Sequence, residues 1–127
     1  MILRPVELSD ASAWEAMRRA LWPEGAEDHA REILAFFAGT RDEPQAVLVL
    51  QEGSSLVAFA EVSIRDDIHE LAGKRVGYVE GLYVVPSFRG RGAARKLLSA
   101  AREWARQNDC EACASDRADR IIVDPHF

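Results

Sequence analysis

The sequence has little cysteine, no long apolar run and no excess of basic residues. Only two cysteines, Cys110 and Cys113, occur among its 127 residues. No apolar run approaches the roughly 20 residues that a membrane-spanning helix needs, and the first residues lack the basic and apolar segments of a signal peptide. We therefore expect a cytoplasmic protein with no membrane partner.

Basic residues are outnumbered by acidic ones. The chain has 16 Lys and Arg against 21 Asp and Glu, which gives a formal net charge of −5. A nucleic-acid-binding protein usually needs a basic face, so we expect no nucleic-acid partner. The acidic surplus permits attraction of a small polycationic substrate, although the same charge also serves solubility.

The CxxC spacing of Cys110 and Cys113 is open to more than one interpretation. A thioredoxin-like motif places its first thiol at a helix N-terminus, whereas this pair falls where a predicted helix ends and a strand begins. A zinc site needs two further Cys or His ligands, and the three histidines show no matching spacing. We favour two small residues, buried or half-buried, at the start of a strand, and expect no metal.

The order of the predicted elements indicates one mixed α/β domain over residues 1–127. The pattern is β, α, α, β, β, β, α, β, which predicts an antiparallel meander followed by one right-handed βαβ crossover. The fold class is therefore α/β (α+β), a mostly antiparallel sheet flanked by helices. We expect strands over 2–4, 46–50, 56–64, 75–85 and 111–115, and helices between Ser9 and Pro23, over 27–38 and over 92–107.

The segment RGRGAA joins the fourth predicted strand to the strongest predicted helix. Glycines let a backbone approach a ligand closely, and the first turn of a helix presents unpaired N–H groups and the positive end of its dipole. We expect the amides of about Arg91 to Lys96 to bind a pyrophosphate, surrounded by basic side chains. The candidate cofactor-binding residues of this loop are Arg89, Gly90, Arg91, Gly92, Ala93, Ala94 and Arg95.

This loop has three other possible interpretations. A Walker phosphate loop is excluded, because no GxxxxGK followed by Ser or Thr is present. A dinucleotide-binding fingerprint finds its GxG in Gly90 and Gly92 and an acidic residue about 20 positions on, but Arg95 stands at the third glycine. A merely structural turn with a solvated basic surface also remains open.

With its flanking strand, the loop resembles the acetyl-CoA loop of the GNAT acetyltransferase superfamily. That loop reads Arg or Gln, two residues, Gly, one residue, then Gly or Ala, and Arg89, Gly92 and Ala94 match it in register. The resemblance covers roughly residues 1–116 and implies acetyl-CoA as cosubstrate. It also implies that the preceding strand pairs its backbone with the pantetheine arm, in the manner of strand addition, through Leu82, Tyr83 and Val84.

Glu80 is the candidate catalytic residue. It precedes Gly81 in an otherwise apolar strand, where a glycine often marks a bulge that redirects a side chain and splays the sheet. Acetyl transfer to an amine requires an unprotonated amine, and a carboxylate can take up the proton directly or through a bound water. Strand alternation alone also allows Glu80 to face solvent.

A narrower resemblance is to aminoglycoside 6′-N-acetyltransferases. It implies an enzyme that moves acetyl from acetyl-CoA to the 6′-amine of an aminoglycoside antibiotic and so confers resistance. An acetyltransferase for another amine and a weakly active CoA-binding relative are the alternatives. The stretches that carry the resemblance are ALWP at 20–23, FAEVSIR at 59–65, YVEGLYV at 78–84 and ASD at 114–116.

Carried over residue by residue, this resemblance implies roles for three side chains. Trp22 would stack on the antibiotic, Glu80 would serve as base or amine ligand, and Asp116 would hold an ammonium. A core position for Trp22 stays open. That family often has an aromatic residue where this chain has Ile68. A polycationic sugar favours a cleft lined by carboxylates, and the candidates are Glu24, Glu27, Asp28, Asp66, Asp67 and Glu70.

The resemblance ends after Asp116. The family continues with a helix and two strands that line the acceptor cleft, whereas this chain reads RADRIIVDPHF. We therefore predict an atypical tail over 116–127 and a sheet that lacks the usual last helix and strands. An unpaired last strand would be an aggregation-prone edge, so a homodimer through that edge is a further hypothesis.

Overall fold

The described strands form one sheet whose spatial order, β1 to β6, follows the order in the sequence. The computed structural model describes residues 1–117 and 120–124, with side chains described for 1–115 except 26. The strands are β1 Ile2–Pro5, β2 Ala46–Glu52, β3 Ser55–Arg65, β4 Val76–Val84, β5 Ala112–Arg117 and β6 Arg120–Asp124. The helices are α1 Ala11–Leu21, α2 His29–Ala38 and α3 Ala93–Gln107.

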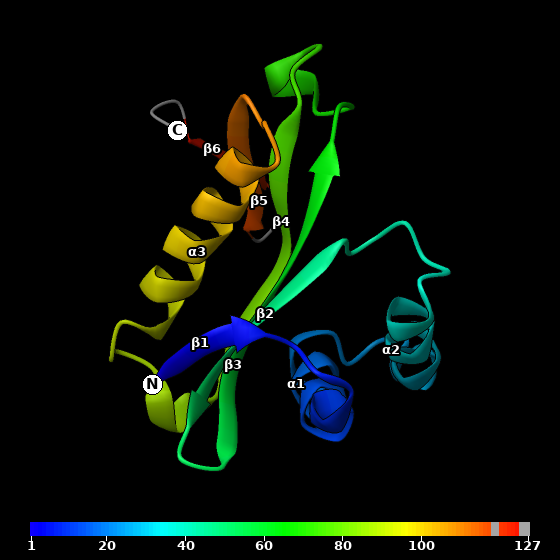
Figure 1. Ribbon diagram of the computed structural model, residues 1–127, viewed down its shortest axis with the longest axis vertical. Helices are drawn as coiled ribbons and strands as arrows, with labels where there is room; N and C mark the ends of the chain where they lie inside the picture. Colours follow the sequence, from blue (N-terminus) through cyan, green and yellow to red (C-terminus); the bar gives the residue numbers. More distant parts are fainter. Residues whose placement is uncertain (118–119, 125–127) are drawn as a thin grey trace.

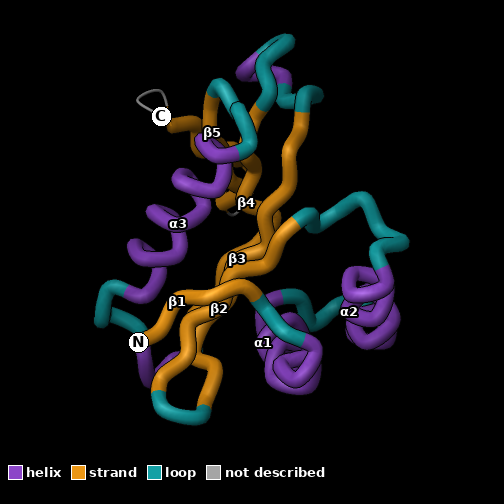
Figure 2. The backbone as a smooth tube through the Cα atoms, viewed as in Figure 1, coloured by secondary structure: helices purple, strands orange, loops and turns teal. Residues whose placement is uncertain are grey.

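The predicted meander and βαβ crossover are confirmed. Neighbouring strands pair antiparallel except β4 and β5, which are parallel and are joined through α3. Helix α3 covers one face of the sheet, and α1 and α2 lie against the other (Figure 1). Figure 2 shows the sheet passing between these helical layers. None of the helices in the described part of the chain has the length and apolarity to cross a membrane.

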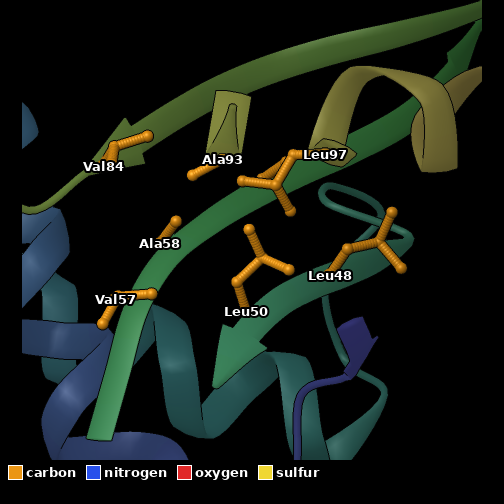
Figure 3. Packing of buried hydrophobic residues seen from close by; sticks show 8 residues of the cluster. Leu48, Leu50, Val57, Ala58, Val84, Ala93 and Leu97 are labelled. Carbon is orange, nitrogen blue, oxygen red and sulfur yellow. The ribbon is translucent and has the colours of Figure 1, made fainter. Parts of the chain in front are cut away.

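Strand β3 is buried on both faces because its side chains alternate between the two helical layers. Ala58 and Ala60 pack in the same cluster as Leu97 of α3, whereas Phe59 packs with Trp14 of α1. Figure 3 shows Leu97 of α3 and Leu50 of β2 facing one another, with Ala58 of β3 beside them. Small residues on this face let α3 lie close to the sheet and so fix where its N-terminus lies.

The helix boundaries follow the sequence signals to within two residues. Trp14 and Met17 are buried, as the apolar stripe of the first helix predicts. Gly39 ends α2 with φ 72°, the left-handed conformation of a C-terminal glycine. Helix α2 begins at His29 rather than at residue 27, because residues 26–28 form a separate 3-10 turn.

The end of the sheet differs from the prediction. The sequence predicts the last strand over residues 111–115, but in the structure β6 follows β5 and pairs with it antiparallel, with Asp116 opposite Ile121. The prediction that β5 is the edge strand is therefore wrong, because β6 ends the described sheet. The apolar run of residues 121–123 is too short to reveal a strand by alternation, so pairing with β5 rather than local sequence defines this element.

Candidate active site

The RGRGAA loop leaves β4 and enters α3 through two glycines with left-handed backbones. Gly90 and Gly92 have φ of 81° and 83°, a conformation that favours glycine. A Cβ added to either residue would meet no atom within 4 Å. The glycines are therefore needed for the loop's backbone shape, and the space over them is open to a ligand.

A pocket of about 530 Å³ lies over this loop and the first turn of α3. Gly92 is the N-cap of α3 and provides no side-chain cap, and the first helical bond runs from Lys96 N to Gly92 O at 3.0 Å. The predicted set of anion-binding amides therefore loses Lys96, whose N–H is used within the helix, and anion binding by the amides before it stays a prediction. The pocket is lined by Val84, Phe88, Arg89, Gly90, Gly92, Ala93, Ala94 and Arg95.

Two of the predicted basic side chains contact aromatic rings. Arg89 donates from Nε to the Val84 carbonyl at 2.9 Å, and its guanidinium lies 5.5 Å from the Tyr83 ring centroid. Arg91 lies 4.7 Å from the Phe88 ring centroid and does not line the pocket. Arg89 therefore fastens the loop to the end of β4 while its charge remains at the pocket.

The sheet separates beside this loop. Strands β4 and β5 pair from Val76 opposite Ala112 to Val79 opposite Ser115, and within the described strands the pairing goes no further. Strand β4 nevertheless continues to Val84. The β5-facing edge of residues 82–84 is thus free of this ladder, which is the geometry that pairing with an extended ligand requires.

The bulge predicted from Gly81 is present between β3 and β4. Glu61 lies opposite Gly81 and Val62 opposite Val79, so Glu80 is the extra residue. A Cβ on Gly81 would lie 2.4 Å from Trp22 Cη2 on the α1 side of the sheet. The bulge therefore interrupts the alternation at Glu80, and Gly81 leaves room for the indole.

The Glu80 carboxylate is held by Arg65, a partner that sequence reasoning missed. Arg65 Nε and Nη2 each donate to a different Glu80 oxygen at 2.7 Å. This bonding raises the pKa of Arg65, so the guanidinium stays charged. Arg65 also lies within ion-pair distance of Glu43, at 3.1 Å, and Asp67, at 3.8 Å. The sequence signal for this ion pair was Arg65 at the end of the stretch FAEVSIR, on the strand before the one that carries Glu80.

Trp22 is half-buried at the end of α1. The Arg18 guanidinium lies 5.2 Å from its ring centroid, and the His29 ring is stacked beside it at 6.4 Å. Trp22 also lines a second pocket, of about 580 Å³. Its stacking on a ligand stays a prediction. The pocket is lined by Arg18, Leu21, Trp22, Pro23, Glu24, Gly25, Asp28, His29 and Glu32.

A buried charged pair beneath Trp22 also escaped prediction. Glu61 is 2% exposed, accepts a hydrogen bond from Trp14 Nε1 at 3.0 Å and lies 3.2 Å from Arg18 Nε. Burial raises the pKa of the Glu61 carboxyl, against the opposing charge of Arg18. Arg18 Nη2 also donates to Glu32 at 2.7 Å. The sequence signal for this buried pair was Glu61, an acidic residue inside the otherwise largely apolar β3.

The other predicted acceptor residues are distributed around this centre. Ser115 pairs with Val79, so Asp116 and Glu80 each follow a paired position, but the Asp116 side chain lies outside the described residues. Ile68 is buried and packs in one cluster with Tyr78. Of the acidic candidates, Glu24 and Asp28 line the Trp22 pocket, Asp67 contacts Arg65, and Asp66 lines a separate pocket.

The CxxC cysteines have a core environment. Cys110 and Cys113 are both buried and form no disulfide, and burial raises the pKa of the Cys110 thiol. Raised thiol pKa values oppose redox and ligand chemistry. Within the described residues, no group of three or more His, Cys, Asp or Glu is arranged to hold a metal ion.

Comparison with known proteins identifies the family. The family model described as the acetyltransferase (GNAT) family matches residues 12–120. An aminoglycoside N(6′)-acetyltransferase type 1 of Klebsiella aerogenes is 43% identical over 118 residues, which cover 91% of this chain and 77% of that protein. The protein of the same name in Stenotrophomonas maltophilia is 36% identical over 115 residues, covering 90% and 73%.

Solved structures agree with this assignment. The aminoglycoside N-acetyltransferase AAC(6′)-Iy in complex with CoA has a TM-score of 0.81 at 28% identity, over 92% of this chain and 76% of that one. The aminoglycoside 6′-N-acetyltransferase AAC(6′)-IG from Acinetobacter haemolyticus has a TM-score of 0.82 at 29% identity, over 93% and 80%. The chain therefore belongs to the GNAT acetyltransferase family and is homologous to its aminoglycoside N(6′)-acetyltransferases.

Proposed function

We propose that this protein transfers acetyl from acetyl-CoA to the 6′-amine of an aminoglycoside. The observation that carries the proposal is the β4 bulge, which presents the Glu80 carboxylate where β4 and β5 separate. Relatives at 43% and 36% identity that bear the name aminoglycoside N(6′)-acetyltransferase support the acceptor. A related structure holds a bisubstrate analogue that joins CoA to acetylneamine.

The donor site is the loop pocket and the free edge of β4. The first-turn amides of α3 would bind the CoA pyrophosphate, with Arg89 and Arg95 adding charge. The backbone of Leu82, Tyr83 and Val84 would pair with the pantetheine arm along the edge that β5 leaves free. This arrangement brings the thioester toward Glu80, because the arm runs along the strand that carries it.

The acceptor site is the region around Glu80. The amine nitrogen attacks the thioester carbonyl carbon, the carbon–sulfur bond breaks, the amine gives up a proton and the departing thiolate gains one. Glu80 would serve as base or amine ligand, Asp116 would bind an ammonium, and Trp22 would border the sugar. The acidic residues Glu24 and Asp28 beside Trp22 favour a polycationic acceptor.

Thiol release from acetyl-CoA in the presence of aminoglycosides tests this function. We expect release with aminoglycosides that bear a 6′-amine and none with counterparts that bear a 6′-hydroxyl. No release across the 6′-amino panel would reject the acceptor, and CoA binding under those conditions would indicate a different amine.

A substitution at the loop tests the donor site. Gly92→Glu should reduce CoA affinity at least about tenfold, because it adds a charge and a side chain where the pyrophosphate would lie. Gly53→Glu is the matched control, since Gly53 also has a left-handed backbone, with φ 59°, and open space over it. Equal CoA affinities for the two variants would contradict the assignment.

We also propose a cytoplasmic location and a homodimer through the outer edge of β6. A chain of 127 residues with only two cysteines is typical of a protein from a reducing compartment. Strand β6 ends the sheet order, and exposed strand edges are common pairing surfaces. Cell fractionation tests the location, and a concentration-independent monomer in sedimentation would reject the dimer.

A further inference from the structure

We propose that Arg65 is a positioning residue that lets Glu80 bind the acceptor amine without holding that amine in its protonated, unreactive form. The inference rests on the proposed function and deepens it, since it assigns the paired carboxylate a specific task. It starts from the bulge, which turns Glu80 toward the last residue of β3.

The two side chains form a bidentate ion pair. Arg65 Nε contacts Glu80 Oε2 and Arg65 Nη2 contacts Glu80 Oε1, both at 2.7 Å. Such fork-like pairs are short, strong and directional. A carboxylate offers about four lone-pair sites, and Arg65 uses two of them. Glu80 therefore keeps acceptor capacity for a substrate N–H while its orientation is fixed.

The guanidinium is held from several other elements. Glu43, in the segment before β2, lies 3.1 Å from Nη2, and Asp67, after β3, lies 3.8 Å from Nη1. The Tyr78 ring centroid lies 4.8 Å from the Arg65 Cζ. With Glu80, these are the charged and titratable side chains that the described structure brings to Arg65. Contacts on so many sides keep the guanidinium in place when a cation arrives.

The chemistry of the amine explains why a paired carboxylate is useful. Only the neutral amine has the lone pair that attacks the thioester. A bare carboxylate near an amine favours its protonated form, because an opposite charge within about 4–6 Å stabilises the ion. The Arg65 charge opposes this stabilisation. Glu80 can therefore accept a hydrogen bond from the neutral amine.

A purely structural role for Arg65 makes different predictions. If the ion pair only ties β3 to β4, its loss lowers stability and weakens substrate binding, with the same fall in rate at every pH. If Arg65 offsets the charge of Glu80, its loss strengthens binding of the cationic acceptor and slows the reaction most at low pH. The two roles therefore move the dissociation constant in opposite directions.

The test compares Arg65→Met and Arg65→Lys with the wild type, with neamine as the probe. Titration calorimetry gives the neamine Kd, and thiol release gives kcat between about pH 6 and 9. For Arg65→Met we expect a Kd lowered about threefold or more, a kcat at pH 7 lowered about tenfold, and an acidic limb of kcat moved up by about one pH unit. Arg65→Lys should restore most of the wild-type profile.

A matched control separates charge from stability. Arg4→Met removes a guanidinium that forms a comparable bidentate pair, with Asp10 at 2.7 and 2.9 Å and with side-chain exposures of 22% and 10%, and should leave the pH profile and the neamine Kd unchanged. A raised Kd in Arg65→Met, with a fall in kcat that is equal at all pH values, would overturn the inference.

The design also separates this inference from the proposed function. If the wild type releases no thiol with any 6′-amino aminoglycoside, the proposed function fails. The binding measurement still decides the role of Arg65, because Arg65→Met must bind neamine more tightly than the wild type. Equal or weaker binding would overturn the inference whether or not the wild type is active.

Discussion

Two glutamate–arginine pairs flank the same bulge, and their surroundings differ. Glu61, opposite Gly81, pairs with Arg18, and both side chains are nearly inaccessible, at 3% and 6% exposure. Glu80, adjacent to Gly81, pairs with Arg65, and these side chains are 15% and 26% exposed. The Glu61–Arg18 pair is thus a buried contact between α1 and β3, whereas the Glu80–Arg65 pair is partly accessible at the candidate site.

Solvent access explains the difference. Glu61 is 2% exposed, and Trp14 Nε1 and Arg18 Nε both contact its Oε2, so the packed side chains around it leave little access for a ligand. Around Glu80, β5 has already separated from β4, so part of the carboxylate remains reachable. Buried pairs cost more desolvation free energy than accessible pairs, which keep part of their contact with water.

Removing the arginine of the buried pair should have the largest effect on stability. Arg18→Met leaves Glu61 as an uncompensated buried charge and should lower the free energy of unfolding by roughly 3–5 kcal/mol at neutral pH. Urea denaturation measures it. Arg65→Met should cost far less stability, because its partner is partly solvated.

The pH dependence of this loss follows from the Glu61 pKa, which lies above its ordinary value of 4.5 because of burial. As pH rises, the unfolded chain releases the Glu61 proton first, so this group's contribution is fully present below about pH 4.5 and is lost through the folded-state pKa. Arg18 lowers that pKa, so Arg18→Met should be more destabilising at pH 8 than at pH 5. An Arg18→Met/Glu61→Leu variant no more stable than Arg18→Met would show that charge was not the cause.

Filling the space at the bulge should have an intermediate effect. Gly81→Ala brings a Cβ within 2.4 Å of the Trp22 ring and should cost about 1–3 kcal/mol while shifting the indole. The matched control is Gly77→Ala, which meets Ala105 at 2.4 Å on the α3 face. We expect both to lose stability but only Gly81→Ala to raise the KM for the aminoglycoside. Equal KM values for Gly81→Ala and Gly77→Ala would contradict a role of Trp22 in binding the aminoglycoside.

A substitution of Asp67, which contacts the Glu80–Arg65 pair from its exposed side, should have the smallest effect on stability. The Asp67 side chain is 68% exposed and lies 3.8 Å from Arg65. Asp67→Asn should therefore change the free energy of unfolding by less than about 0.5 kcal/mol. If Asp67→Asn lowers the free energy of unfolding by more than about 1 kcal/mol, the Arg65–Glu80 pair depends on Asp67 more than the exposure of Asp67 indicates.

Local signals predicted much of this molecule. Glycines predicted the turns of the RGRGAA loop, where φ is positive at Gly90 and Gly92, and the bulge, where a Cβ on Gly81 would meet Trp22. Apolar periodicity located α1, α2 and α3. The residue partners were not predictable in this way, since Arg18 and Arg65 reach their glutamates across the fold, at separations that no local pattern encodes. Strand β6 depends likewise on pairing with β5.

The role of Glu80 is tested most directly by comparing kcat/KM for a 6′-amino aminoglycoside in the wild type and in Glu80→Gln. We predict a loss of about 100-fold or more, from the loss of the carboxylate that handles the amine proton, with the free energy of unfolding kept within about 1 kcal/mol. Glu103→Gln, an exposed change on α3, should match the wild type. Wild-type kcat/KM in Glu80→Gln would contradict the claim that this carboxylate is the centre of the acceptor site.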